Sequence, residues 1–81
     1  MAYNNPTPSQ STTLTAEERS KEARRILTML REEDQDEVEH RLTVRALEFV
    51  QGKWLEMDLG GQVSVTENQL FWLRDLWQKF L

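Results

Sequence analysis

The chain lacks most of the residues that stabilise or equip very small proteins by covalent or metal chemistry. Its 81 residues include no cysteine and one histidine. Without cysteine, disulfide bonds and thiolate metal sites are excluded. His40 alone cannot form a cluster of imidazole ligands, and we expect no metal and no cofactor. Because a domain of this size buries a modest share of its surface, association with another protein or a second copy is the remaining common source of stability.

Acidic residues outnumber basic ones by 14 to 10, and long apolar runs are absent. The formal net charge is −4, which argues against a mainly electrostatic nucleic-acid-binding protein, because phosphate requires a basic surface. No apolar run approaches the length that spans a membrane. The N-terminus lacks the charged and apolar regions of a signal peptide. We therefore expect a cytoplasmic protein that does not associate with membranes.

Motifs of known enzymes are missing as well. The sequence contains no glycine-rich phosphate loop, nucleophile elbow, zinc-binding helix or Walker motif. Glu37 and Glu39 flank His40, but catalysis needs a nucleophile, a base and a stabilising group in fixed positions. No such set can be singled out, so the sequence predicts a protein that is not an enzyme.

The composition divides the chain into two parts. Residues 1–13 are mostly Asn, Pro, Ser, Thr and Gln, and such a segment cannot bury enough apolar surface to offset the entropy lost on ordering. It is predicted to be a disordered tail. Residues 14–81 are predicted to form a single helical domain.

Thr15, Thr43 and Thr66 each follow an apolar residue. A threonine hydroxyl at the N-cap accepts a hydrogen bond from a free amide of the first helical turn. Glu18 and Gln69 stand three residues after the first and third threonine, as in a capping box. The pattern predicts three helix starts.

The spacing of apolar residues predicts three helices, over 16–33, from 36 or 43 to 58, and over 67–81. The acidic run 32–39 contains no glycine or proline to separate the first two helices. Asp34 or Asp36 can cap a new helix there, and a single long bent helix is the alternative. The predicted fold is an all-α three-helix bundle with a disordered N-terminal tail.

Residues 54–65 also allow a different interpretation. Apolar and polar residues alternate in 55–59 and in 63–65, and the pair Gly60-Gly61 stands between them. This pattern is typical of a β-hairpin. We favour the helix because residues 46–57 also fit a helical face and a lone hairpin is marginal in water. An α+β fold with a small hairpin at 54–65 is the alternative.

The C-terminal segment 70–81 holds two of the three tryptophans and two of the three phenylalanines. On a helical wheel, one half is apolar and is expected to face the core: Leu70, Leu73, Leu76, Trp77, Phe80 and Leu81. Phe71 and Trp72 lie outside the centre of this stripe. Aromatic residues dominate the energetics of protein interfaces, so both are candidate partner-binding residues. Alternatively, the helix is covered on two sides and buries both rings.

Charged residues gather in two places. The acidic run supplies four further candidate partner-binding residues, which could mimic a phosphate backbone or simply form a solvated helix end: Glu33, Asp34, Asp36 and Glu37. A basic stripe occupies the first helix: Lys21, Arg24, Arg25 and Arg31. Glutamates interleave with it, so a salt-bridged surface is favoured over phosphate binding.

Two segments of the C-terminal half, Leu42-Thr43 … Glu48-Phe49-Val50 and Val65-Thr66-Glu67-Asn68-Gln69-Leu70-Phe71-Trp72-Leu73, resemble a pattern in small phage and prophage accessory proteins. In these proteins a helix containing Phe-Val leads through a short loop to Thr-x-x-Gln-x-x-Trp-Leu. The glycine pair and the valines before Thr66 depart from the usual shorter loop. The resemblance implies a helix–loop–helix in an accessory factor that blocks a host or defence complex.

Taken together, these features predict a non-enzymatic protein-binding module, such as a phage-type inhibitor or an assembly factor. Its contacts would be the aromatic C-terminal helix and the acidic run. Two other functions stay open. One is a nucleic-acid-binding or nucleoprotein-binding helical subunit that uses the basic stripe, and the other is a self-assembling homo-oligomer.

Overall fold

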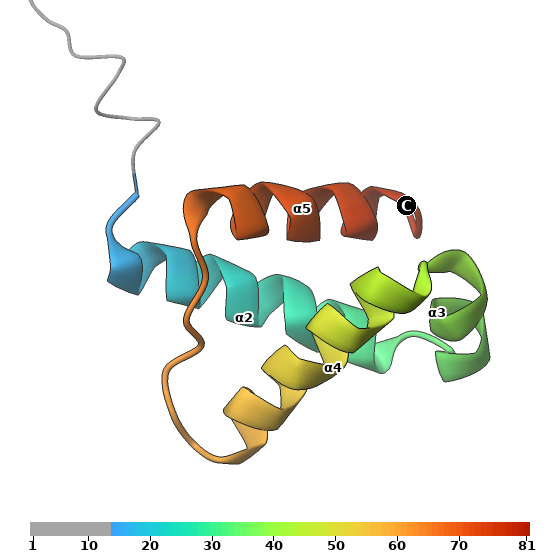
Figure 1. Cartoon of the computed structure of the whole chain (residues 1–81), viewed down its shortest axis with the longest axis horizontal. Helices are drawn as coiled ribbons and strands as arrows, with labels where there is room; N and C mark the ends of the chain where they lie inside the picture. The colour runs from blue at the N-terminus through green and yellow to red at the C-terminus, as the bar shows by residue number, and fades with distance from the viewer. Residues whose placement is uncertain (1–13) are drawn as a thin grey trace, which may run out of the picture.

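The computed structural model describes residues 14–81, which form four helices (Figure 1). They are α2 (Ala16–Glu32), α3 (Gln35–Arg41), α4 (Val44–Asp58) and α5 (Glu67–Gln78). Among these residues there is no strand, so the all-helical fold is confirmed for this part of the chain. The predicted tail, residues 1–13, lies outside the described residues.

Each of the three predicted threonine caps begins a helix. Thr15 and Thr66 form complete capping boxes with Glu18 and Gln69, in which side chain and backbone bond reciprocally at 2.9 and 3.1 Å. The Thr43 hydroxyl accepts from the amide of Ala46 at 3.1 Å. These bonds satisfy amides that have no partner inside the helix, which explains why three helix starts could be located from local sequence alone.

The predicted count of three helices is wrong, because the second predicted helix is two helices. Asp34 caps α3 by accepting from the amide of Asp36 at 2.9 Å, and Thr43 caps α4. Between them Leu42 is extended and buried, and its amide bonds to the carbonyl of Val38 at 3.1 Å. The two proposed starts were therefore both used, and burial of Leu42 turns the chain between them.

The hairpin alternative at 54–65 is also wrong. The helix α4 runs through Trp54 to Asp58, and Gly60, with a φ of 81°, donates its amide to the carbonyl of Met57 at 3.0 Å. Glycine adopts this left-handed conformation at little cost, so it commonly follows the end of a helix. The glycine pair thus ends a helix instead of joining two strands.

The alternation in 63–65 comes from an extended segment that lies across the core. Val63 and Val65 are buried and Ser64 is exposed. The polar backbone atoms of Ser64 bond to α4 side chains: its carbonyl accepts from Lys53 Nζ at 2.6 Å, and its amide donates to Glu56 Oε1 at 3.2 Å. Side chains thus satisfy the backbone where a partner strand would in a hairpin.

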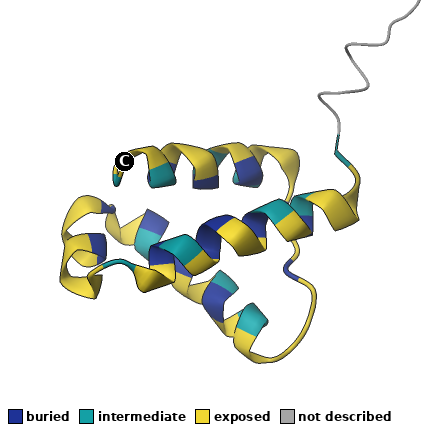
Figure 2. Cartoon of the chain, turned by 180° about the vertical axis from the view of Figure 1, so that it is seen from behind, coloured by how far each residue is buried: buried dark blue, intermediate teal, exposed yellow. Residues whose placement is uncertain are grey.

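The core lies where α2 meets the other three helices (Figures 1 and 2). In α2 the buried apolar residues recur at helical spacing: Ala23, Ile26, Leu27 and Leu30. They pack with buried residues of the other elements: Val38, Leu42, Ala46, Val50, Trp54, Val63, Val65, Leu70, Leu73 and Leu76. The indole Nε1 of Trp54 donates to the carbonyl of Leu27 at 2.9 Å and so joins α4 to α2.

The C-terminal ends of two helices differ from the prediction. The helix α5 ends at Gln78 and α2 at Glu32, before the predicted residues 81 and 33. Leu81, expected in the core, is 79% exposed because it lies beyond the last helical turn. Within residues 14–81, no helix combines the length and the apolar character needed to cross a membrane.

Candidate functional site: an aromatic surface on the C-terminal helix

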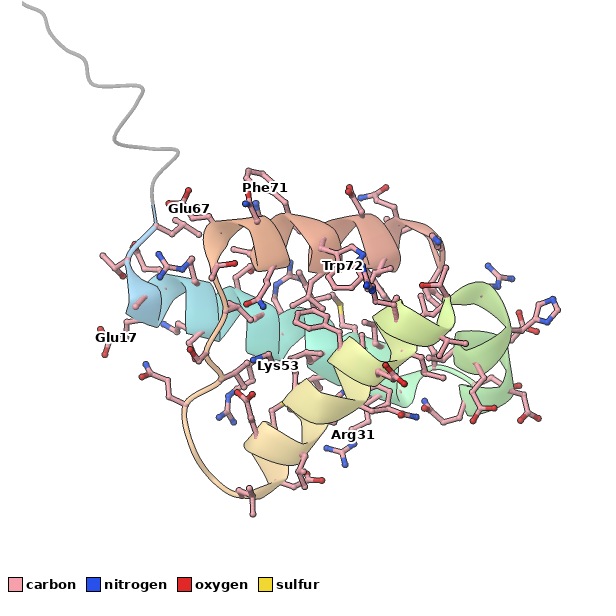
Figure 3. All side chains as sticks on the ribbon, in the orientation of Figure 1. Glu17, Arg31, Lys53, Glu67, Phe71 and Trp72 are labelled. Atoms are coloured by element: carbon pink, nitrogen blue, oxygen red, sulfur yellow. The ribbon has the colours of Figure 1, made fainter. Side chains whose placement is uncertain are left out.

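Phe71 and Trp72 lie on different sides of α5 (Figure 3). Phe71 points away from the other helices and is 59% exposed, whereas Trp72 points toward α4 and is half-buried. Consecutive residues of an α-helix diverge by about 100°, so neighbours in sequence need not share a surface. The two candidate contact residues therefore do not form one patch.

Trp72 helps to hold α5 and α4 together. Its ring stacks on that of Phe49, with centroids 4.8 Å apart and planes inclined by 18°. The ammonium of Lys53 lies 5.9 Å from the centroid of Phe49 on the same helix. This packing gives Trp72 a structural role, and its predicted contact with a partner stays a prediction.

Phe71 lies beside a charged group of side chains between α5 and α2. The guanidinium of Arg74 is 6.0 Å from the Phe71 ring centroid, and its Nη2 lies 3.8 Å from Glu22 Oε2. Arg25 also binds that carboxylate, at 2.7 Å. The adjoining shallow hollow is lined by Leu14, Glu18, Lys21, Glu22, Arg25 and Arg74. We call Phe71, Arg74, Arg25 and Glu22 the Phe71 surface.

The carboxylate of Glu22 is ionised more readily than usual. Its pKa lies below the ordinary value of 4.5, chiefly because Arg25 donates hydrogen bonds to it, and the positive charges of Arg25 and Arg74 add to the effect against partial burial. The same contact raises the pKa of Arg25. Two arginines share this one carboxylate, and Glu67 and Asp75 stand one helical turn before and after Phe71 on α5.

Two other carboxylates are held in the same way outside this surface. A hydrogen bond from Lys53 lowers the pKa of Glu56, and the amide of Ser64 adds to this effect. Arg31 makes two bonds of 2.8 Å to Asp58 and lowers the pKa of that carboxyl group. The Arg31–Asp58 pair joins α2 to α4. The Lys53–Glu56 pair lies within α4, and both of its side chains bond to the backbone of Ser64 in the segment after that helix.

These lowered pKa values predict acid sensitivity. The unfolded chain takes up protons at a higher pH than the folded chain, so unfolding becomes easier as the solution is acidified. The stabilisation is complete above the ordinary carboxyl pKa and disappears as the pH falls through the lowered values. Urea unfolding between about pH 7 and pH 2 measures it. We expect Glu22→Gln to flatten the dependence, and a variant profile identical to that of the wild type would contradict this prediction.

The acidic candidates lie at the opposite end of α2 from the start of α5, around α3 (Figure 1). Asp34 is used as the cap of α3, and Glu37 pairs with Arg41 at 2.9 Å. Glu33 ends α2 with its amide bonded to the carbonyl of Leu30, while Asp36 is exposed in the first turn of α3. The structure thus does not bring this group together with Phe71, and its partner-binding role stays a prediction.

The basic stripe on α2 is largely engaged within the chain. Arg25 binds Glu22 and Arg31 binds Asp58. Arg24 donates to the carbonyl of Gly61 at 2.9 Å, which fixes the loop after α4. Lys21 lies at the two shallow hollows on either side of the first half of α2. Three of the four residues of the basic stripe are therefore paired or hydrogen-bonded within the chain, in keeping with the favoured salt-bridged interpretation.

One exposed apolar surface was missed from the sequence. Val44, Leu55 and Leu59 are 75%, 60% and 78% exposed on the outer side of α4. A helical wheel of 44–59 places them opposite the buried residues Ala46, Val50 and Trp54, and that signal was available.

Residues 14–81 contain no cluster of three histidine, aspartate or glutamate side chains arranged to hold a metal ion. Comparisons with family models, with curated proteins and with solved structures find no match to this chain. The surfaces described above are therefore the basis from which a function can be inferred.

Proposed function

We propose that the chain is a non-enzymatic protein-binding module that uses the Phe71 surface. The observation that carries this proposal is the 59% exposure of Phe71 on the outer side of a helix whose inner side is buried. An exposed phenylalanine contributes nothing to the core. Transfer of such a side chain into a partner's apolar pocket gains about 1.5–3 kcal/mol.

The charges beside the ring define the kind of partner. Arg74 and Arg25 converge on Glu22, and arginine at an interface binds carboxylates in a planar, two-pronged geometry. The best complement is a protein surface with an apolar pocket for Phe71 and an aspartate or glutamate at its edge. This mixed apolar and charged chemistry favours a protein over a nucleic acid as the partner.

The finer role is an inhibitor or assembly factor that acts on a host or defence protein complex in the cytoplasm. This part of the proposal is supported by the resemblance of residues 42–50 and 65–73 to a pattern in small phage and prophage accessory proteins. A small module that presents one anchor residue acts by occupying a site on a larger complex. The acidic residues around α3 would then make secondary contacts.

Phe71→Ala tests the proposal. We expect it to weaken binding of the partner by about 30-fold, because removal of an interface hot spot costs about 2 kcal/mol or more. The measurement has two steps: affinity capture from the native host with quantitative mass spectrometry, then titration calorimetry with the purified partner. Leu81→Ala is the matched control, since Leu81 is also exposed but lies beyond the end of α5.

The same captured proteins at the same yield from wild type and Phe71→Ala would contradict the proposed function. Equal losses from Phe71→Ala and Leu81→Ala would indicate nonspecific apolar adsorption and would also contradict it. Circular dichroism of both variants shows that the helices are intact.

A further inference from the structure

Residues 61–65 link α4 to α5 and lie against α2 and α4 in an extended conformation (Figure 1). We call residues 61–65 the strap. Two buried side chains, Val63 and Val65, anchor the strap in the core. In helices and sheets the backbone groups bond to one another. Within residues 14–81, no backbone–backbone hydrogen bond involves the strap, so it is held in a different way.

Side chains of the neighbouring helices make the hydrogen bonds that hold the strap. From α4, Lys53 and Glu56 bond to the carbonyl and the amide of Ser64. From α2, two arginines donate to the first and the last carbonyl of the strap at 2.9 Å: Arg24 to Gly61 and Arg19 to Val65. None of these bonds is part of the backbone ladder of a helix. The strap can therefore be released without breaking a helix.

The middle of the strap gains little from being buried. Val63 is 1% exposed, yet within residues 14–81 neither its amide nor its carbonyl has a hydrogen-bond partner. Burial of peptide groups without partners costs about as much as burial of a valine side chain gains. Both groups recover hydrogen bonds when the strap moves into water. The burial of Val63 therefore adds little to the stability of the closed arrangement.

We propose that the strap is a conformational device that opens as a unit while the four helices stay folded. One hinge is Gly60, whose φ is 81° and whose backbone changes conformation at little cost. The other is the junction of Val65 with Thr66, the N-cap of α5, since hinges commonly lie at the ends of elements. Opening withdraws Val63 and Val65 from the core and gives access to the apolar strip that they cover. Such local openings need less free energy than global unfolding.

Native-state hydrogen exchange of the full chain, followed by NMR, tests the proposal. The amides of Val63 and Ser64 report opening of the strap, and the amide of Leu27, in the middle of α2, reports global unfolding. We expect the protection factors of the two strap amides to be about 100-fold lower or less, and their exchange to depend less on urea. Equal protection and equal urea dependence of all three amides would overturn the proposal.

Two variants separate opening of the strap from global unfolding. Glu56→Ala removes the acceptor of the Ser64 amide, and we expect exchange at Val63 to become about tenfold faster. Leu76→Ala leaves a cavity in the core near the far end of α5, and we expect it to lower the protection of Leu27 by about tenfold or more without changing that of Val63. Equal acceleration of Leu27 and Val63 by Leu76→Ala, or unchanged exchange at Val63 in Glu56→Ala, would overturn the proposal. These results do not depend on the Phe71 surface.

Discussion

Trp54→Ala should lower the free energy of unfolding by about 3–5 kcal/mol, as the loss of a large buried aromatic side chain generally does. Trp54 is 9% exposed and lies in the core between α4 and α2. Its Nε1 donates to the carbonyl of Leu27 at 2.9 Å, and the guanidinium of Arg31 lies 5.7 Å from the ring centroid. The substitution removes the packing, the hydrogen bond and the cation–π contact together.

Urea unfolding followed by circular dichroism measures this effect without relying on tryptophan fluorescence. Trp54→Phe is the matched control, since it keeps an aromatic ring and removes the donor. We expect a loss of about 1–2 kcal/mol from the missing hydrogen bond and the smaller ring. If Trp54→Ala cost less than about 1 kcal/mol, α4 would not pack on α2 through this residue.

Leu73→Ala should lower the free energy of unfolding by about 2–5 kcal/mol, the usual cost of a cavity at a buried leucine. Leu73 is fully buried on the side of α5 that faces the core. A small domain has a total stability of about 5–15 kcal/mol at most. This single substitution is therefore expected to remove a large share of it and to lower the unfolding midpoint clearly.

Phe71→Ala, two residues earlier on the same helix, provides the control for Leu73→Ala. We expect it to change the free energy of unfolding by no more than about 0.5 kcal/mol, as is usual at exposed sites. Chemical unfolding of the two variants side by side measures the difference between the two sides of α5. Similar large losses from both would show that the Phe71 ring is buried and would remove the basis of the proposed binding surface.

Helix starts and the buried side of each helix could be predicted from the sequence because their causes are local. A threonine cap with Glu18 or Gln69 three residues later satisfies amides within one turn. Apolar spacing in turn fixes which side of a helix faces inward. Leu70, Leu73 and Leu76 were placed in the core on this ground, and they are buried.

The division of the second helix and the absence of a hairpin depended on contacts that are distant in sequence. Asp34 and Thr43 are both adequate caps, so local sequence offered two starts without deciding between them. Both caps are used, because the chain is extended at the buried Leu42 between the two helices. At 63–65 the alternating pattern fits a strand equally well, and only Lys53 and Glu56 of α4 supply the bonds that a partner strand would have made.

The candidate site likewise depends partly on local sequence and partly on contacts between helices. The position of Phe71 on the outer side of α5 follows from helical periodicity, which the sequence alone determines. The stacking of Trp72 on Phe49 and the sharing of Glu22 by Arg74 and Arg25 depend on how α4 and α5 pack against each other and on α2. Periodicity is a property of one helix, whereas these contacts depend on how several helices are oriented, and only the tertiary structure sets that orientation.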